Sequence, residues 1–441
     1  MLIETKTPPD DVLFEAGCRH RIASVLVHRG AKRVMLVIQP RWADLAASIA
    51  SDLGPRWAGT FDGVTVQVPE DVVTAAHRAA KNANADWVLA VGGGSAIGVA
   101  KVLALDIKDL QIAALPTTYA GSERTPIWGR IVNGDKFTGR DDRVLPAQVF
   151  YDPVLQRSLP IATAQQSLFN ALAHSLEALC DPTAHPSAHA AARDSLTPLW
   201  RSIDNLATHP DDPSVCATAL RGAWKASEAL AGARMALHHK LAHVLGALGT
   251  AHGPTHATLL PYTIAFNQSA APTMTAAVRS AWNVEDAGAA LYDKLHAHGL
   301  PTSLSALQLS IDDVERAADM AVERVYPNPR PFNRADIAQL LHGARLGRRP
   351  TANTTRLPLP TGPPCLAFRG ECVVTPFLVA APCVGRWGAL RVGGQRRHCV
   401  THDLCDKKMH RQRNAWAIDQ EFAKPAVLDT MRRKSETHGH S

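Results

Sequence analysis

The sequence lacks the features that mark membrane-spanning, secreted or metal-finger proteins. None of its apolar runs approaches the ~18–20 residues of a membrane-spanning helix. Its N-terminus continues into acidic and proline-rich residues, which is not a secretion signal. The cysteines in the body of the chain, Cys18, Cys180 and Cys216, are isolated and have no metal-ligand spacing. We therefore expect a cytoplasmic protein with reduced thiols and no membrane partner.

A surplus of basic residues is also missing from most of the chain, although the formal net charge is +7. Residues 352–441 contain 14 Lys and Arg but only 7 Asp and Glu, so this stretch accounts for the whole excess. The remaining residues are balanced in charge. This balance gives no reason to expect a nucleic-acid partner.

The 441 residues are enough for two or three domains, and the pattern changes twice along the chain. Up to residue 160, strand-like runs alternate with helical ones, which predicts a mostly parallel sheet. The expected strands are 34–38, 64–67, 87–91 and 112–115, and the expected helices between them are 42–53, 72–82 and 95–105. Residues 161–350 have helical spacing throughout, and we expect an all-helical catalytic domain there.

Residues 351–441 form a third segment of different character. A proline-rich stretch at 357–364 excludes a continuous helix, and five of the eight cysteines follow it. The segment has no steady periodicity and resembles translation in a shifted reading frame. We expect a poorly ordered basic tail. A zinc site built from Cys399, His402 and Cys405 is a remote alternative.

An apolar run, Trp87–Val91, leads into Gly92, Gly93 and Gly94, followed by Ser95 and a helical stretch. This order predicts a strand, a tight turn and a helix. Without Cβ atoms the turn lets a phosphate approach the backbone, and the first N–H groups of the helix then point at it. The spacing differs from the Gly-x-Gly-x-x-Gly fingerprint. The segment favours a dinucleotide site, and an ordinary tight turn is the alternative.

Two further patterns are candidates for chemistry. The loop Thr117-Thr118-Tyr119-Ala120-Gly121-Ser122-Glu123 offers hydroxyls for a phosphate or a ribose, or is an ordinary polar turn. Polar side chains four residues apart occur as three pairs: Asn170 and His174, His239 and His243, and His252 and His256. Each such pair lies on one face of a helix. Converging imidazoles can bind a divalent metal, or they can donate protons and bind carboxylates near neutral pH.

In their order along the chain, these motifs resemble the iron-containing alcohol dehydrogenase superfamily and, within it, the maleylacetate reductases. The segments that carry the resemblance are 92–101, 115–123, 125–129, 170–179, 238–246, 300–304 and 326–331. The resemblance spans roughly residues 12–350. It implies an α/β dinucleotide-binding domain followed by an all-α domain, as in dehydroquinate synthase-like proteins, and a homodimer.

Two positions favour the reductases over the alcohol dehydrogenases. Gly98 and Asn170 stand where the dehydrogenases have Asp, and an amide at position 170 removes a charged oxygen ligand from a hard divalent site. The resemblance therefore implies a reaction that uses NADH or NADPH and does not require a metal. The positions equivalent to metal ligands are Asn170, His174, His239 and His252.

The implied activity is reduction of the maleylacetate C=C bond to give 3-oxoadipate during the degradation of aromatic compounds. His243 is the implied proton donor, and His174, His239 and His252 would position the substrate and stabilise the enolate. Candidates for the two substrate carboxylates are Arg140, His256 and Arg330. The candidate cofactor-binding residues are Gly92, Gly93, Gly94, Ser95, Thr117, Thr118, Gly121, Ser122 and Lys136.

Some residues depart from the family pattern. Arg124 replaces an apolar residue beside the cofactor loop, and the interval from His243 to His252 is one residue short. No acidic residue follows the strand 34–38 to reject a 2′-phosphate, and Arg41 suits one. Two alternative functions stay open: a metal-dependent alcohol dehydrogenase of the same superfamily, and an inactive binding protein with a damaged C-terminus.

Overall fold

The computed structural model describes residues 11–65, 68–133, 135–323 and 326–352. All of them belong to one compact unit, Met1–Pro363. The expected tail, including Cys399, His402 and Cys405, lies outside the described residues. Within the described residues, no helix is both long enough and apolar enough to cross a membrane.

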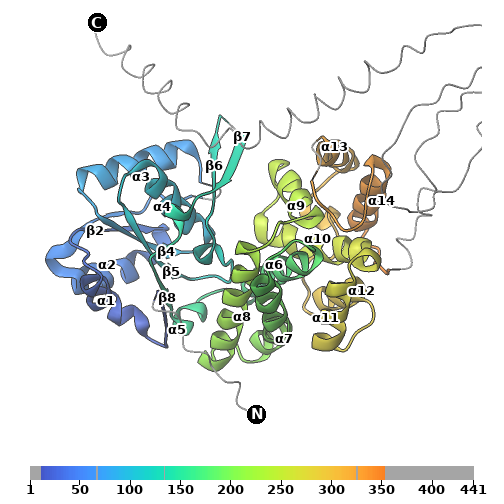
Figure 1. Ribbon diagram of the computed structural model, residues 1–441, viewed down its shortest axis with the longest axis horizontal. Helices are drawn as coiled ribbons and strands as arrows, with labels where there is room; N and C mark the ends of the chain where they lie inside the picture. Colours follow the sequence, from blue (N-terminus) through green and yellow to red (C-terminus); the bar gives the residue numbers. More distant parts are fainter. Residues whose placement is uncertain (1–10, 66–67, 134, 324–325, 353–441) are drawn as a thin grey trace, which may run out of the picture. The chain divides into compact units, whose positions relative to one another are not determined.

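A six-stranded parallel sheet forms the first part of the unit (Figure 1), as the sequence predicts. Its order is β1-β8-β5-β4-β2-β3. The strands are β1 (Val12–Phe14), β2 (Val34–Ile38), β3 (Trp57–Phe61), β4 (Trp87–Gly92), β5 (Gln111–Pro116) and β8 (Gln148–Tyr151). The central strands β2 and β4 are buried along their whole length, because helices cover both faces of the sheet.

Around strands β2 and β4, two helices pack on each face of the sheet (Figure 1). The helices α1 (Ile22–His28) and α2 (Ala43–Leu53) pack on Leu36 and Leu89, whereas α3 (Glu70–Asn82) and α4 (Gly94–Asp106) pack on Val37 and Val88. The strand order reverses between β2 and β4. In a doubly wound sheet, ligands bind beside such a reversal at the carboxyl ends of the strands.

One predicted strand is wrong. Val64 and Thr65 are not in a strand, Val66 and Gln67 lie outside the described residues, and the edge strand of the sheet is β3 instead. The apolar side chain of Val64 belongs to a loop and is buried in the same hydrophobic cluster as residues of α3 and α4. The antiparallel hairpin made by β6 (Ile127–Val132) and β7 (Asp135–Arg140) was not predicted.

Helices make up the second part of the unit (Figure 1), as expected. They are α5 (Pro153–Gln156), α6 (Ile161–Cys180), α7 (Pro186–Thr208), α8 (Pro213–Ala231), α9 (Leu237–Ala247), α10 (His252–Asn267), α11 (Pro272–Trp282), α12 (Ala287–Ala297), α13 (Ile311–Val322) and α14 (Arg334–Arg345). One hydrophobic cluster contains residues of both the sheet and the helices. In it, Tyr151 of β8 stacks on Trp224 of α8 with ring centroids 5.7 Å apart.

Candidate functional site

The glycine-rich turn has the geometry that the sequence predicts. Strand β4 ends at Gly92, whose φ of 152° favours glycine, and α4 begins at Gly94. Gly93 precedes the helix and provides no side-chain cap. A Cβ at Gly93 would lie 2.9 Å from Thr118 Cγ2, so the turn packs closely on the loop after β5. The first N–H groups of α4 can therefore face an anion, as helix N-termini do.

The loop after β5 joins the turn to the helical part. The backbone N–H of Thr117 donates to the Gly92 carbonyl at 3.0 Å. The backbone N–H of Tyr119 donates to Ser167 Oγ of α6 at 3.0 Å. Gly121 has a φ of 77°, and a Cβ there would lie 2.7 Å from Ser227 Cβ of α8. The loop is therefore held on both sides by close packing.

Lys101 of α4 is a residue of this region that the sequence analysis did not single out. Its side chain is completely buried, and Nζ lies within 2.6–3.1 Å of the carbonyls of Ser122, Thr125 and Ile127 and of Thr125 Oγ1. Burial lowers the pKa of Lys101 to about 7, while the nearby Glu123 opposes this shift. The lysine thus fastens the second half of the loop to the helix that begins at the glycine-rich turn.

Glu123 is the acidic residue of the same buried network. Tyr151 donates its hydroxyl to Glu123 Oε1 at 2.8 Å, and burial raises the pKa of the Glu123 carboxyl. Arg124, the departure from the family pattern, forms an ion pair with Asp11. Its guanidinium is therefore engaged at the edge of the sheet.

The predicted histidines do converge. His174 of α6 and His239 of α9 have ring centroids 5.1 Å apart, and His239 lies 5.1 Å from His256 of α10. His252 and His256 are 4.2 Å apart, and His239 and His243 are 6.3 Å apart. Three helices therefore bring their imidazoles together, as the spacing of four residues allows.

The buried imidazoles have defined hydrogen-bond partners. His239 Nδ1 lies 2.5 Å from Glu177 Oε2, and because a carboxylate only accepts, Nδ1 donates. His238 contacts Thr263 Oγ1 through Nδ1 at 3.1 Å and His256 Nδ1 through Nε2 at 3.0 Å. Both Glu177 and His238 are functional candidates that the sequence analysis missed. His238 stood in the quoted motif beside His239, and Glu177 stood three residues after His174.

Burial and charge set the protonation of these rings. Burial lowers the pKa values of His174, His238 and His256 well below the usual range, and neighbouring imidazoles lower them further. These three rings are therefore neutral near pH 7. His243 and His252 are exposed, which suits proton exchange with solvent.

The candidate carboxylate-binding residues are spread over several elements. Arg140 of β7 donates to the Ala231 carbonyl at the end of α8. The Arg330 guanidinium lies 4.1 Å from the Phe266 ring centroid and donates to the Phe266 carbonyl at 3.3 Å. His256 is completely buried among the imidazoles. Lys136 lies in β7, and its side chain is outside the described part of the structure.

The donor atoms of the imidazole cluster suit a divalent metal in type. Asn170 Oδ1, His174 Nδ1, His239 Nε2 and His256 Nε2 are buried without a hydrogen-bond partner among the described residues. Imidazole nitrogens and an amide oxygen are metal ligands. Within the same residues, however, no three His, Cys, Asp or Glu side chains are gathered closely enough to hold an ion. A bound metal would therefore need these side chains to move closer together.

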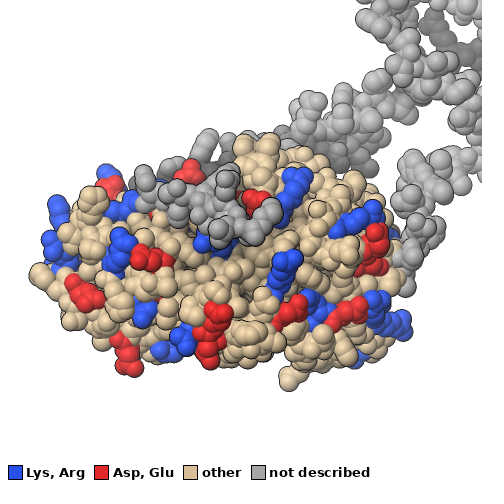
Figure 2. All heavy atoms as spheres, turned by 90° about the horizontal axis from the view of Figure 1, so that it is seen from below, with Lys and Arg blue, Asp and Glu red and all other residues tan. Residues whose placement is uncertain are grey.

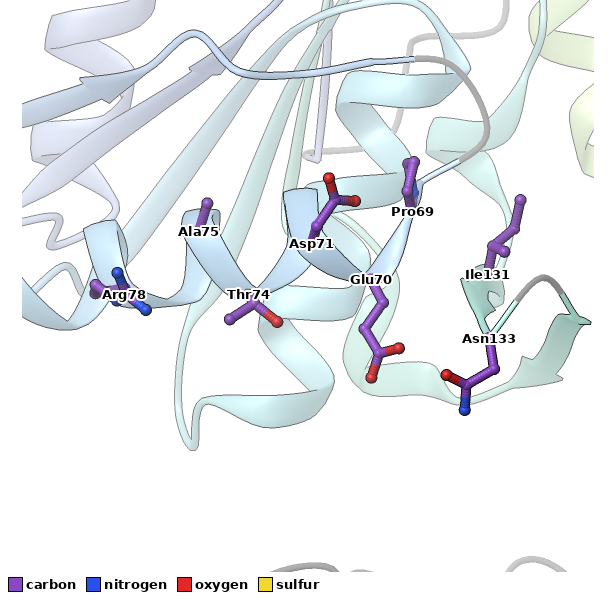
Figure 3. A pocket seen from close by; sticks show the side chains of 8 residues that line it. All are labelled: Pro69, Glu70, Asp71, Thr74, Ala75, Arg78, Ile131 and Asn133. Carbon is purple, nitrogen blue, oxygen red and sulfur yellow. The ribbon is translucent and has the colours of Figure 1, made fainter. Parts of the chain in front are cut away.

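A surface hollow of about 690 Å³ lies elsewhere, at the start of α3 beside the β6–β7 hairpin (Figure 3). Glu70, Asp71, Arg78 and Asn133 are among its lining residues, and none of the predicted site residues lines it. Figure 2 shows basic and acidic side chains interspersed over one face, and the described part of that face has no extended patch of one sign. The three free cysteines among the described residues, Cys18, Cys180 and Cys216, are buried.

Known proteins match this chain over both parts. Residues 9–153 match the family model described as iron-containing alcohol dehydrogenase, and residues 164–345 match that of the Fe-containing alcohol dehydrogenase family, C-terminal. Maleylacetate reductase 2 of Cupriavidus pinatubonensis is 42% identical over 346 residues, which are 78% of this chain and 96% of that protein.

Solved structures agree in fold. The maleylacetate reductase from Agrobacterium tumefaciens has a TM-score of 0.74 and 37% identity, and the match covers 79% of this chain and 100% of that one. An iron-containing alcohol dehydrogenase from Corynebacterium glutamicum has a TM-score of 0.74 and 33% identity, and the match covers 81% and 99% of the two chains.

One expectation from the sequence is contradicted by these matches. We inferred from Asn170 that no metal is required, but both family models and the Corynebacterium structure are of iron-containing enzymes. Loss of one charged ligand weakens a metal site without abolishing it, because imidazoles and an amide oxygen still bind divalent ions. The chain is an oxidoreductase and belongs to the iron-containing alcohol dehydrogenase family.

Proposed function

We propose that this chain is a maleylacetate reductase, which reduces the C=C bond of maleylacetate with NADH or NADPH to give 3-oxoadipate. The main support is the convergence of imidazoles from α6, α9 and α10 in a chain that is 42% identical to a maleylacetate reductase. In this proposal residues 1–160 form the dinucleotide-binding domain and residues 161–350 the catalytic domain. The reaction belongs to the degradation of aromatic compounds.

The pyrophosphate of the cofactor would lie on the N-terminus of α4. Gly92, Gly93, Gly94 and Ser95 would contact it through their backbone, because helix N-termini attract phosphates. Thr117, Thr118, Gly121, Ser122 and Lys136 would complete the cofactor site. Strand β2 ends at Ile38, and the side chain of the next residue, Gln39, lies near Gly92. No carboxylate there repels a 2′-phosphate. Arg41 beside it suits NADPH, and NADH is the other possible cofactor.

The chemistry proceeds by conjugate addition. A hydride from the reduced nicotinamide adds to the alkene carbon β to the ketone, and the π electrons move to give an enolate. His243, which is exposed at the edge of the cluster, then donates a proton to the adjacent carbon. His174, His239 and His252 would position the substrate and stabilise the enolate oxygen. Consumption of one hydride and one proton per alkene balances the reaction.

The substrate is a dicarboxylate and needs cationic partners. Arg140 and Arg330 carry permanent charges, and each would bind a carboxylate in bidentate fashion. His256 is neutral because burial lowers its pKa, so in this proposal it contributes hydrogen bonding without charge.

The family adds a divalent metal to the expected cofactors. Asn170, His174, His239 and His252 would hold it, which agrees with the unpartnered atoms of the first three. Bound there, a metal would supply Lewis-acid polarisation of a carbonyl oxygen. The same residues would support the second candidate, a metal-dependent alcohol dehydrogenase, because the Corynebacterium protein, which is 33% identical, is an iron-containing alcohol dehydrogenase.

We further propose a homodimer in the cytoplasm that acts on small molecules and binds no nucleic acid. The exposed edge strand β3 carries Trp57, which is 46% exposed and would be covered by a second copy. Size-exclusion chromatography with light scattering measures this directly. A monomer at all concentrations would contradict the dimer.

The decisive test is an absorbance assay of reduced nicotinamide with maleylacetate, with NADH and NADPH in turn, and with and without a chelator. His243→Ala should lower kcat by about 10²–10⁴-fold, as expected for loss of a general acid, and change the nucleotide Kd less than about twofold. His296→Ala, an exposed histidine of α12, is the matched control. Oxidation of simple alcohols without maleylacetate reduction would establish the second candidate instead.

A further inference from the structure

Helix α9 carries His239 and His243, but its own sequence does not cap its N-terminus. The residue before it, Ala236, has no side chain that can accept a hydrogen bond, and no acidic residue stands in the first turn. The first N–H groups of a helix need acceptors from elsewhere when they are buried. Leu237, His238 and His239 are all buried, so water does not supply these acceptors.

Two residues from distant parts of the chain supply them. Glu177 Oε1 of α6 accepts the backbone N–H of His238 at 2.7 Å. Asn328 Oδ1, which follows α13 in the chain, accepts the backbone N–H of Leu237 at 3.3 Å. The negative charge of Glu177 at this end of the helix also complements the helix dipole.

The second carboxylate oxygen of Glu177 binds the side chain of His239. Oε2 accepts from His239 Nδ1 at 2.5 Å, so one carboxylate holds both the helix backbone and the imidazole. Because Nδ1 carries the hydrogen, the unpartnered Nε2 of His239 presents its lone pair to the cluster. The side chain of Glu177 is completely enclosed, with 1% exposure, which fixes this geometry.

Asn328 uses its whole hydrogen-bonding capacity. Its amide forms a reciprocal pair with the Asn267 amide, at 2.9 Å and 2.8 Å. Its Nδ2 also donates to the Arg330 carbonyl at 2.7 Å. With the bond to Leu237, two donated and two accepted bonds are made, which is what an asparagine amide can form. Asn328 thereby joins the start of α9, the end of α10 and the backbone of Arg330.

We propose that Glu177 and Asn328 are positioning residues that form a remote cap on α9 and hold His239 and His243 in place for the reaction. This gives a role to Asn328 in the segment 326–331, in which the sequence analysis assigned a role to Arg330 alone. The proposal rests on the proposed reductase activity. Neither residue touches the reacting atoms in this account, and both act through α9.

Three variants separate the parts of the cap. Asn328→Ala removes the acceptor of Leu237 together with the amide pair, whereas Asn267→Ala removes the pair and leaves that acceptor. Glu177→Gln keeps an oxygen for the His238 N–H but no longer accepts from His239 with a carboxylate. Asn205→Ala, an exposed asparagine of α7, is the control.

The first readout is hydrogen exchange of the peptide 237–247 in the free protein. Loss of a capping interaction corresponds to about two- to thirtyfold in the local opening equilibrium. Asn328→Ala should raise exchange in the first turn of α9 by this factor, Asn267→Ala by less, and Asn205→Ala not at all. Unchanged exchange in Asn328→Ala would overturn the proposal.

The second readout is the division between kcat and nucleotide affinity. Glu177→Gln and Asn328→Ala should lower kcat about tenfold or more and change the nucleotide Kd less than about twofold. The reason is that the proposed nucleotide site is formed by the loop after β5 and the N-terminus of α4, and not by α9. Unchanged kcat in both variants, or an equal loss in kcat and affinity, would show that the cap does not position the histidines. Failure of the wild-type chain to reduce maleylacetate would refute the proposed function, and the exchange experiment would still test the cap.

Discussion

Replacement of the buried Lys101 by methionine tests the loop that carries the proposed cofactor site. The change leaves the buried carbonyl of Thr125 and the partly buried carbonyls of Ser122 and Ile127 without their donor. An unsatisfied buried polar group costs about 1–3 kcal/mol of folding free energy. Removal of the buried cation offsets part of this cost, because the desolvation penalty of the ammonium group disappears. We expect Lys101→Met to lower the free energy of unfolding by about 2–4 kcal/mol near pH 7.

The pH dependence of this loss has a defined sign. Burial lowers the pKa of Lys101 from 10.5 to about 7. Between these values the unfolded chain binds a proton at this lysine that the folded chain has released, so the stability contributed there rises with pH. This stability contribution of Lys101 is fully present above about pH 10.5 and is lost as the pH falls through about 7. The difference between wild type and Lys101→Met should therefore widen from pH 7 to 10, by at most about 1.4 kcal/mol per pH unit.

Urea unfolding of both proteins at several pH values measures this difference. Lys108→Met, an exposed lysine just after α4, is the control and should change stability by less than about 0.5 kcal/mol. Fluorescence titration with reduced nicotinamide cofactor should show weaker binding by Lys101→Met, because the loop loses its fastening. If the stability difference between wild type and Lys101→Met stays constant from pH 7 to 10, the lowered pKa of Lys101 is refuted. Unchanged nucleotide affinity would refute the role of the loop.

Other substitutions test neighbouring parts of the site. Gly93→Ala places a Cβ 2.9 Å from Thr118 Cγ2 and should weaken nucleotide binding about tenfold or more while thermal unfolding shifts little; equal affinity would argue against a phosphate at this turn. Asn170→Asp adds a charged oxygen ligand and should increase the rise in Tm caused by Fe²⁺ or Zn²⁺, since binding to the folded state stabilises it. An equal rise in both proteins would contradict a metal site at Asn170.

The sequence predicted the glycine-rich turn and the convergence of the histidines, but it did not predict the edge strand β3 or the β6–β7 hairpin. The glycine-rich turn was found because β4 is apolar without interruption and ends in three glycines, a local pattern with a local cause. Apart from the pair His252 and His256, helix α10 has little signal in the sequence, since it begins with His252-Gly253-Pro254, contains Pro261 and is buried around its circumference after the first turn. A helix without a polar face gives no amphipathic signal.

The missed site residues have a different cause. Glu177 accepts from His238, 61 positions away in the chain, and Asn328 accepts from Leu237, 91 positions away. No spacing rule links residues that far apart. Lys101 belonged to a quoted motif, but its contacts depend on the path of the loop at 122–127, which only tertiary structure defines. Contacts of this kind are set by packing and not by periodicity.

The loop after β5 connects the two halves of the proposed reaction. Its first half is bonded to Ser167 of α6 through the Tyr119 backbone, and its second half is held by Lys101 of α4. His174 follows Ser167 by seven residues on α6, which corresponds to about 10 Å along the helix axis. The loop that would bind the nucleotide thus contacts α6 about 10 Å along the helix axis from His174. We therefore expect the nicotinamide of a nucleotide bound by α4 and this loop to lie near the imidazoles. For this reason, substitutions in the loop are expected to alter both cofactor affinity and kcat, whereas substitutions at the start of α9 should alter kcat alone.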